Sequence, residues 1–192
     1  MIESRSRSLD LREVVVSVED IERDFSHQVP DEHPVIDQRG LTFVPHVLPV
    51  LVGTTVDFPN SDPVSHNVFS ISAPKRFNLG MYSTGGMKSI TFDRLGRVDL
   101  QCNVHREMHA IILVKKNPYF STCEKQGEFS IPDVPAGDHI VQAWHEQYGP
   151  AVQEVTVPAD GTVWVNFHLA RDSARKVNYR DAQIAEKLEE QK

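Results

Sequence analysis

The stretch from Cys102 to Met108 contains three side chains that can bind a metal ion, and it reads CNVHREM. A thiol at Cys102, an imidazole at His105 and a thioether at Met108 follow one another at intervals of three residues. Thiolate, imidazole and thioether are ligands that soft copper prefers, and blue-copper sites combine two His and one Cys in a plane with a weak axial Met. The stretch therefore predicts three of the four ligands of a mononuclear copper site.

The fourth ligand should be a second imidazole from another part of the chain. His66 is our candidate, because it follows a cluster of turn-forming residues at 59–63 and precedes the apolar pair Val68 and Phe69. His46 lies on a predicted strand that leads toward the same site. We expect the seven remaining histidines to be ordinary surface or core imidazoles: His27, His33, His46, His109, His139, His145 and His168.

Other kinds of metal site fit the residues less well. A structural zinc site is disfavoured because Met is not a usual zinc ligand, although zinc also accepts Cys and His. The His-x-His and His-Cys-His patterns of multicopper enzymes do not occur in the sequence. Cys123, the second of two cysteines, lies too far beyond the ligand stretch to complete a two-copper centre, and we expect it to be unpaired. The sequence therefore indicates a protein that is not an enzyme.

The elements that must position these ligands are predicted to be strands. Short β-branched runs alternate with Pro- and Gly-containing turns, which favours an all-β fold for a chain that is 40% hydrophobic. Val98, Leu100 and Cys102 alternate with polar residues, so Cys102 should point toward the core. We expect strands at 13–18, 47–52, 54–58, 89–92, 98–102, 110–114, 128–131, 139–144, 153–157 and 162–169, and loops at 21–38 and 73–88.

The chain is predicted to divide into three parts. Residues 10–118 should form the copper-binding domain, and residues 119–170 should form a small β-sandwich. The last segment, 171–192, is charged and carries Val177, Ile184 and Leu188 at helical spacing, which predicts a C-terminal helix.

The ligand stretch resembles that of the cupredoxins, in particular the Cys-x2-His-x2-Met loop of amicyanin. Residues 53–60 (GTTVDFPN) and 65–68 (SHNV) resemble the approach of that family to its first His ligand. Residues 117–120 (NPYF), 129–137 (FSIPDVPAG) and 143–146 (AWHE) resemble bacterial methylamine-utilisation or plastocyanin-like proteins. The resemblance spans residues 13–169. It implies a Greek-key cupredoxin β-sandwich followed by a small β-sandwich like transthyretin or a carboxypeptidase regulatory domain.

The resemblance also implies roles for individual residues. His66, Cys102 and His105 would bind one type 1 copper ion in a plane, and Met108 would be the axial ligand. Asn67 would bond across to the Cys-bearing loop and fix it. Val104 and Arg106 replace the prolines that flank this His in amicyanin, and Glu107 follows. The exposed edge of His105, with the opposite charges of Arg106 and Glu107, would be the polar docking patch through which electrons leave.

Three functions remain open at this point. The first is a carrier of single electrons between redox partners, either cytochromes or oxidoreductases. The second is a copper storage or delivery protein that handles Cu(I), in which Met81 and Met87 would take part. The third is a β-sandwich scaffold that has the ligand stretch by chance.

Charge and hydropathy limit the partners and the compartment. A net charge of -7 argues against binding to nucleic acid, which requires clustered Lys and Arg. No stretch of about twenty apolar residues occurs, so we expect no membrane span. The N-terminus also lacks the apolar segment of a signal peptide. We expect an extracytoplasmic, periplasmic protein whose leader has been removed, and a cytoplasmic location is the alternative.

Overall fold

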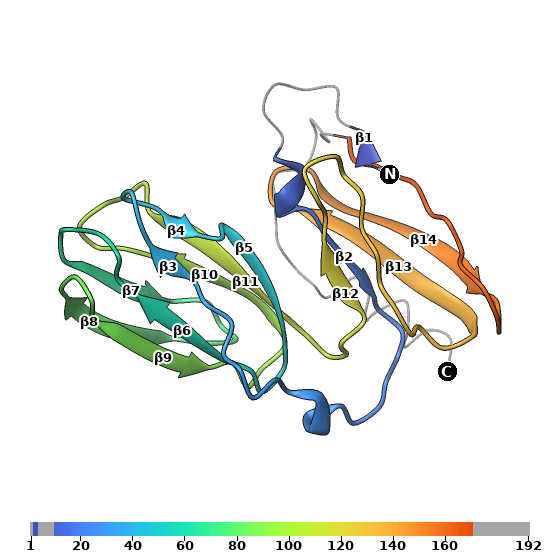
Figure 1. Ribbon diagram of the computed structural model, residues 1–192, viewed down its shortest axis with the longest axis horizontal. Coiled ribbons are helices and arrows are strands. Elements are labelled where there is room, and N and C mark those ends of the chain that lie inside the picture. The colour runs from blue at the N-terminus through green and yellow to red at the C-terminus, as the bar shows by residue number, and fades with distance from the viewer. Residues whose placement is uncertain (1, 4–9, 171–192) are drawn as a thin grey trace.

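The all-β fold predicted from the sequence is confirmed. The computed structural model describes residues 2–3 and 10–170, in which the only helices are the single-turn segments Leu11–Glu13 and Ser26–Gln28. No helix within these described residues is both long and apolar enough to cross a membrane. The predicted C-terminal helix at 171–192 lies outside the described residues. Figure 1 shows two β-sheet units side by side.

The first unit, which we define as β3 to β11, is built on a five-stranded sheet. Its strands follow the order β5-β11-β10-β7-β8, and β5 and β11 are parallel while the other neighbours are antiparallel. Two further pairs, β6 with β9 and β3 with β4, complete the unit. The bounds are β3 Asp37–Gln38, β4 Phe43–Val44, β5 Val47–Leu51, β6 Thr55–Pro59, β7 His66–Ser70, β8 Phe77–Tyr82, β9 Met87–Thr91, β10 Gly96–Gln101 and β11 His109–Lys115.

Alternation along the strands places the core of the first unit directly beneath the predicted site. Val98 and Leu100 of β10 are fully buried, and Cys102 continues the same face into the core, as the pattern predicts. Phe58 of β6 and Phe92, which follows β9, are buried in the same cluster. The ligand-bearing ends of the strands are therefore anchored in close-packed apolar material.

The second unit contains a four-stranded sheet in the order β12-β2-β13-β14, together with the short parallel pair β1 and β15. The bounds are β1 Ile2–Glu3, β2 Val15–Val18, β12 Phe120–Thr122, β13 Gly137–His145, β14 Gly149–Val157 and β15 Phe167–His168. Strand β2 lies within the segment predicted as the copper-binding domain, yet it pairs with β12 and β13 of this second sheet. The domain division at 118/119 stays a prediction.

Strands β2 and β11 are buried on both faces, and this explains why apolar residues predominate in both. Val14, Val16 and Val18 pack into the core of the second unit, whereas Val15 points the other way. In β11, Ile111 and Leu113 likewise point away from the core of the first unit. Both faces of β11 are therefore apolar along its centre, and in β2 only Ser17, itself buried, interrupts the apolar residues.

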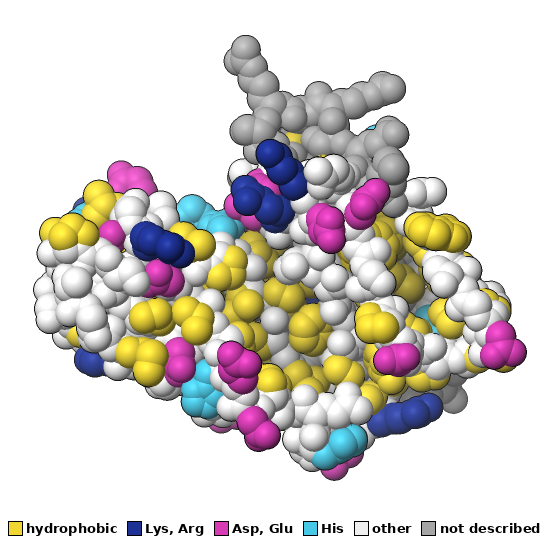
Figure 2. Space-filling model, in the orientation of Figure 1, with side chains coloured by type: hydrophobic (Ala, Val, Ile, Leu, Met, Phe, Trp, Pro, Cys, Tyr) yellow, Lys and Arg dark blue, Asp and Glu magenta, His cyan; other side chains and the backbone are white. Residues whose placement is uncertain are grey.

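The outward faces of these two strands meet at the junction between the units. Val15 of β2 and Trp144 of β13 form one buried cluster with Val47 of β5 and with Ile111 and Leu113 of β11. Burial of each such side chain contributes roughly 1.5–3 kcal/mol relative to its exposure. Hydrophobic side chains also gather over the junction on the face shown in Figure 2. This packing holds the two units in a defined arrangement.

A charged network lies beside this apolar cluster. Arg97 of β10 contacts Glu146, which follows β13, at 3.1 Å, and its guanidinium lies over the Trp144 ring at 5.7 Å. Glu146 also accepts a hydrogen bond from the His46 imidazole at 3.0 Å. The His46 bond, followed by the charge of Arg97, lowers the pKa of Glu146 from 4.5 to about 2 against the opposing effect of burial.

This network predicts acid sensitivity. A carboxylate whose pKa is lower in the folded state stabilises the fold fully above pH 4.5, and its contribution disappears as the pH falls toward 2. The contribution of Glu146 is up to about 3 kcal/mol. In metal-free buffer, the difference in unfolding free energy between the wild type and Glu146→Gln should therefore shrink across that range, as measured by urea denaturation. Glu154→Gln, on an exposed position of β14, is the control and should show no such trend.

The strand predictions differ from the structure in several segments. Residues 73–88 were predicted to be a loop, but β8 occupies the middle of this segment and β9 begins near its end. The glycines there concealed the strand, and Gly80 has a positive φ of 68° within β8. Conversely, residues 128–131 form no strand, and only Phe167–His168 of the predicted strand at 162–169 is extended and paired.

Candidate metal centre

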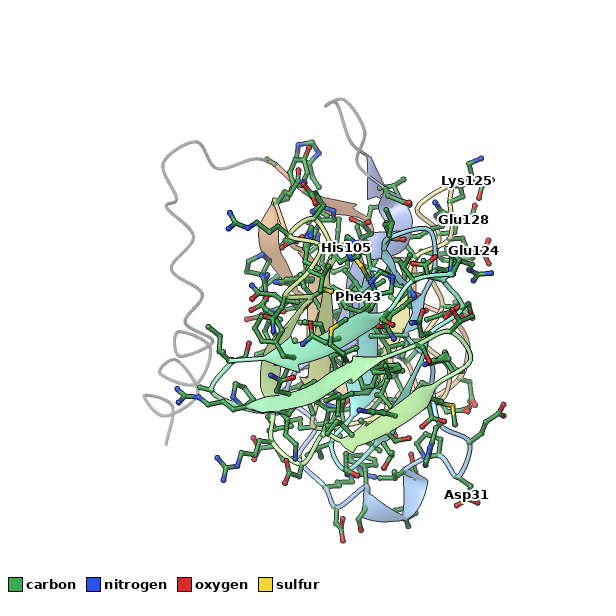
Figure 3. The ribbon with its side chains drawn as sticks, turned by 90° about the vertical axis from the view of Figure 1, so that its left-hand side faces the viewer. Asp31, Phe43, His105, Glu124, Lys125 and Glu128 are labelled. Atoms are coloured by element: carbon green, nitrogen blue, oxygen red, sulfur yellow. The ribbon has the colours of Figure 1, made fainter. Side chains whose placement is uncertain are left out.

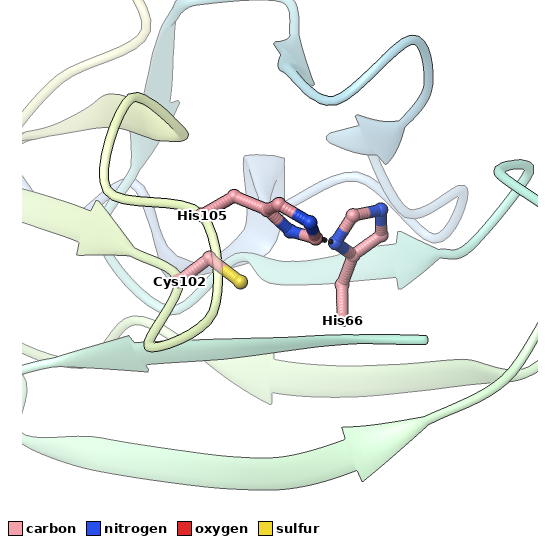
Figure 4. A group of neighbouring side chains, drawn as sticks. All are labelled: His66, Cys102 and His105. Atoms are coloured by element: carbon pink, nitrogen blue, oxygen red, sulfur yellow. Dashed lines mark hydrogen bonds between the residues drawn. The ribbon is translucent and has the colours of Figure 1, made fainter. Parts of the chain in front are cut away.

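The structure brings His66, Cys102 and His105 together. His66 is the first residue of β7, Cys102 directly follows β10, and His105 lies in the loop between β10 and β11. One ligand atom from each residue lies within 4.8 Å of the other two. Figure 4 shows the Cys102 sulfur and the two imidazole rings facing a common point. The neighbouring strands β7 and β10 pair at Phe69 and Gln101, which sets the spacing of the two ligand-bearing segments.

The orientation of His66 is fixed by a carboxylate that the sequence analysis missed. Its Nε2 lies 2.7 Å from the Asp62 carboxylate, and both side chains are buried. Asp62 in turn accepts hydrogen bonds from the backbone N–H groups of Gly40 at 2.5 Å and Leu41 at 3.0 Å. Burial alone would raise the pKa of Asp62, but the bonds from Leu41, His66 and Gly40 outweigh it and hold the pKa below its usual value. Asp62 is therefore an anionic partner of His66.

This bond determines which nitrogen of His66 is available. Because Nε2 donates its proton to Asp62, Nδ1 is the nitrogen with a free lone pair. That Nδ1 lies 3.0 Å from Nδ1 of His105, and the rings meet edge to face with centroids 4.8 Å apart. A metal ion that binds both nitrogens must replace any proton that lies between them. The pair is thus set to accept a metal ion through Nδ1 of each ring.

Asn67 connects the two ligand-bearing segments. Its side-chain oxygen accepts a hydrogen bond from the backbone N–H of Asn103 at 2.7 Å, and its amide group donates to Asn78 at 3.3 Å. Asn67 is buried beside His66, and Asn103 is adjacent to Cys102. The contact therefore holds the loop that carries Cys102 against the strand that carries His66.

Replacement of Asn67 by alanine should loosen this connection. The Asn103 N–H would lose its partner, and an unsatisfied donor of this kind costs roughly 1–3 kcal/mol. We expect a lower unfolding free energy in denaturant and a broader, weaker visible band of the copper-loaded protein. Asn78→Ala is the matched control, because it removes the outer, 3.3 Å contact of Asn67 and an exposed bond from the Gly80 N–H but leaves the contact of Asn67 with Asn103 in place. An Asn67→Ala protein with the stability and spectrum of the wild type would contradict this role.

Met108 lies at the end of the same loop. Its backbone N–H donates to the His105 carbonyl at 3.0 Å, which closes a tight turn between the two residues. Its side chain is fully buried in the cluster that also contains Cys102. A buried thioether on the same turn as the imidazole is a suitable weak ligand, and its assignment as the axial ligand remains a proposal.

The edge of the site reaches the surface at His105. This side chain is half-buried, and its neighbours Arg106 and Glu107 are exposed. In the view of Figure 3, His105 lies in the upper half of the molecule, well away from Asp31 at the bottom. The other two clustered residues are enclosed, since His66 is fully buried and Cys102 is 5% exposed. His105 is therefore the part of the cluster that a partner molecule can approach.

The residues present fit a copper ion. The donor set consists of one sulfur and two imidazole nitrogens, the trigonal set typical of blue copper. Cys102 is not in a disulfide and can act as a thiolate. Cys123, also free, is buried in the second unit, where burial raises its pKa to about 11. Cys102 is therefore the cysteine suited to hold a metal.

Fold and donor set together define an all-β protein with a buried site of two His and one Cys. No protein-family model matches the chain, and no curated protein matches it. The chain is similar in structure to a copper-containing nitrite reductase from Thermus scotoductus, with 29% identity and a TM-score of 0.43. That similarity covers 45% of this chain and 23% of the reductase, so the chain spans less than a quarter of that protein's length.

Two smaller proteins are similar over a comparable part of the chain. A purple cupredoxin from Nitrosopumilus maritimus is 26% identical, with coverage of 43% of this chain and 99% of the cupredoxin and a TM-score of 0.39. A reduced mutant of amicyanin is 23% identical. The similarity covers 52% of this chain and 98% of amicyanin, with a TM-score of 0.42. Cupredoxins are thus among the solved structures that are similar to this chain, over about half of its length. The likeness of the second unit to a carboxypeptidase regulatory domain stays a prediction.

Proposed function

We propose that this protein carries single electrons by means of one type 1 copper ion. His66, Cys102 and His105 would bind the ion in a plane, and Met108 would be the weak axial ligand. The observation that carries this proposal is the convergence of the first three side chains, whose ligand atoms all lie within 4.8 Å. Burial of the thiol and of one imidazole excludes the water that would otherwise compete for the metal.

Bound copper would supply a couple between Cu(II) and Cu(I), and the chain would keep its ligands in place during the exchange. Asp62 fixes the His66 ring, and Asn67 fixes the loop of Cys102. Ligands that are held by such partners change position little when the charge of the metal changes. This rigidity supports electron transfer with little reorganisation, and it supports a role as a carrier rather than an enzyme.

The surface around His105 would be the docking site for a redox partner. Arg106 and Glu107 place opposite charges beside the half-buried imidazole, so the partner should present a mixed-charge surface around its own redox centre. A cytochrome or an oxidoreductase meets this description. We place the protein in the periplasm or another extracytoplasmic compartment, where a copper thiolate would function.

The test is a visible absorption spectrum of the purified protein after addition of one equivalent of Cu(II), followed by ascorbate. An intense thiolate-to-copper band that bleaches on reduction and returns on reoxidation is the expected result. A protein that binds copper without such a band would refute the type 1 assignment.

One observation favours the alternative, Cu(I) storage or delivery. The thioethers of Met81 on β8 and Met87 on β9 are 51% and 60% exposed, and Met81 lies opposite Asn67 in the β7–β8 pair. Exposed thioethers are suited to pass Cu(I) between proteins. A Cu(I) chelator distinguishes the two functions: copper should leave a carrier slowly because His66 and Cys102 are buried, and it should leave a delivery protein rapidly.

A further inference from the structure

A second cluster of metal-binding side chains lies at the junction of the two units. It consists of His46, which directly precedes β5, His109, which begins β11, and Glu146, which directly follows β13. The first two residues belong to the first unit and the third to the second unit. One ligand atom from each residue lies within 4.8 Å of the other two.

Three atoms of this cluster converge. Nε2 of His46 lies 3.0 Å from Oε2 of Glu146, and Nε2 of His109 lies 3.8 Å from the same oxygen. The two imidazole rings meet edge to face, with centroids 4.6 Å apart. One carboxylate oxygen of Glu146 therefore faces two imidazole nitrogens. An ion pair would need only one imidazole.

The remote atom of each side chain is held by a separate partner. Nδ1 of His46 donates to the carbonyl oxygen of His109 at 3.1 Å, and Nδ1 of His109 donates to the carbonyl oxygen of Glu107 at 3.1 Å. Oε1 of Glu146 accepts from Arg97 at 3.1 Å. Histidine ligands characteristically donate their second N–H to a carbonyl or carboxylate, which leaves the other nitrogen for the metal. Both histidines show this arrangement, although a metal ion would have to displace the proton that Nε2 of His46 donates to Glu146, and Arg97 holds the remote oxygen of the carboxylate.

The charge and accessibility of the cluster also suit a divalent ion. The Arg97 guanidinium pairs with Oε1 of Glu146 at 3.1 Å, and Oε2 of the same carboxylate faces the two imidazoles. The side chains of His46 and Glu146 are 21% and 22% exposed, and that of His109 is 54% exposed. An ion can therefore enter from solvent and retain water in its remaining positions.

We propose that His46, His109 and Glu146 bind a divalent zinc ion across the junction of the two units. Two imidazole nitrogens and one carboxylate oxygen, with a fourth position open to water, form a ligand set typical of zinc. The set contains no sulfur, which separates it from the copper site in chemistry as well as in place. The proposal does not depend on the electron-carrier function. Bound zinc would link β5 and β11 to the segment after β13.

Zinc titration of the full-length protein tests the proposal. After removal of metals with a chelator, Zn²⁺ is added and the number of bound equivalents is measured by isothermal titration calorimetry. The wild type should bind one more equivalent than Glu146→Gln, and also one more than His109→Gln. The same difference should appear in a Cys102→Ser background, because the second cluster does not use the thiol. Zinc should also raise the melting temperature of Cys102→Ser more than that of the Cys102→Ser, Glu146→Gln double variant.

His33→Gln is the matched control. His33 pairs with Asp57 at 3.0 Å on the surface, as His46 pairs with Glu146, but no second imidazole completes that pair within the described residues. The His33→Gln variant should bind the same number of zinc equivalents as the wild type. If Glu146→Gln fails to fold by circular dichroism, the result for His109→Gln decides, since the His109 side chain is 54% exposed and its replacement should disturb the fold little. Equal stoichiometry in the wild type and His109→Gln would overturn the proposal and leave only an ion-pair network.

Discussion

Cys102→Ser is expected to abolish the visible absorption of the copper-loaded protein completely, together with its reversible reduction. The band arises from charge transfer between thiolate and copper, and serine offers a hydroxyl that remains protonated and binds copper poorly. Serine has nearly the size of cysteine, so the buried position should tolerate it with little change in the fold. Absorption spectra before and after ascorbate, with protein folding checked by circular dichroism, measure the effect.

Cys123→Ser is the control for this experiment. Cys123 is also free and buried, but it lies in the core of the second unit. Its replacement should leave the band at full intensity, even if the hydroxyl lowers stability in that apolar setting. A Cys102→Ser protein that retains the band would refute both the ligand assignment and the proposed function.

Asp62→Asn should weaken copper binding by about 10–100-fold, the usual consequence of losing a carboxylate that orients a ligand histidine. The amide has one acceptor oxygen, whereas the carboxylate accepts from His66, Gly40 and Leu41. At least one of these donors would lose its partner beside the buried Asp62 side chain, at a cost of up to about 1–3 kcal/mol in unfolding free energy. Copper affinity is measured by competition with a chelator of known strength, and stability by denaturant unfolding.

Asp57→Asn provides the comparison, because Asp57 also contacts a histidine through its carboxylate but does so near the surface, with His33. This variant should retain the copper affinity of the wild type. If Asp62→Asn and Asp57→Asn bind copper equally well, Asp62 does not orient His66 for metal binding.

The ligand loop could be found from sequence because its chemistry is local. Cys102, His105 and Met108 are three residues apart, and the strand that ends before them has clear alternation. The His66 position required one further observation, its place after a turn cluster. Asp62 was not recognised, although it lies four residues before His66, because that spacing indicates a contact only when the turn between them is known.

The second cluster could not be predicted in the same way. His46, His109 and Glu146 come from three separate segments, and they meet only because the two units pack at Trp144, Ile111 and their neighbours. The same is true of β2, whose partners lie far away in sequence. Composition and periodicity indicated that these strands exist, but long-range pairing depends on packing that no local pattern describes.

The position of β2 in the second sheet has a consequence for how the protein is synthesised. The ribosome completes β2 early, but its neighbours β12 and β13 emerge only after the entire first unit has been made. The second sheet therefore cannot form until β12 and β13 have been synthesised. The strands of the first unit are contiguous in sequence, so this unit can fold during translation. The backbone N–H of Val18 donates a hydrogen bond to the carbonyl oxygen of Tyr119 at 2.9 Å. The chain therefore passes from the second unit to the first, and back again, at two neighbouring points. Along the chain, the first unit is therefore an insertion between β2 and β12 of the second sheet.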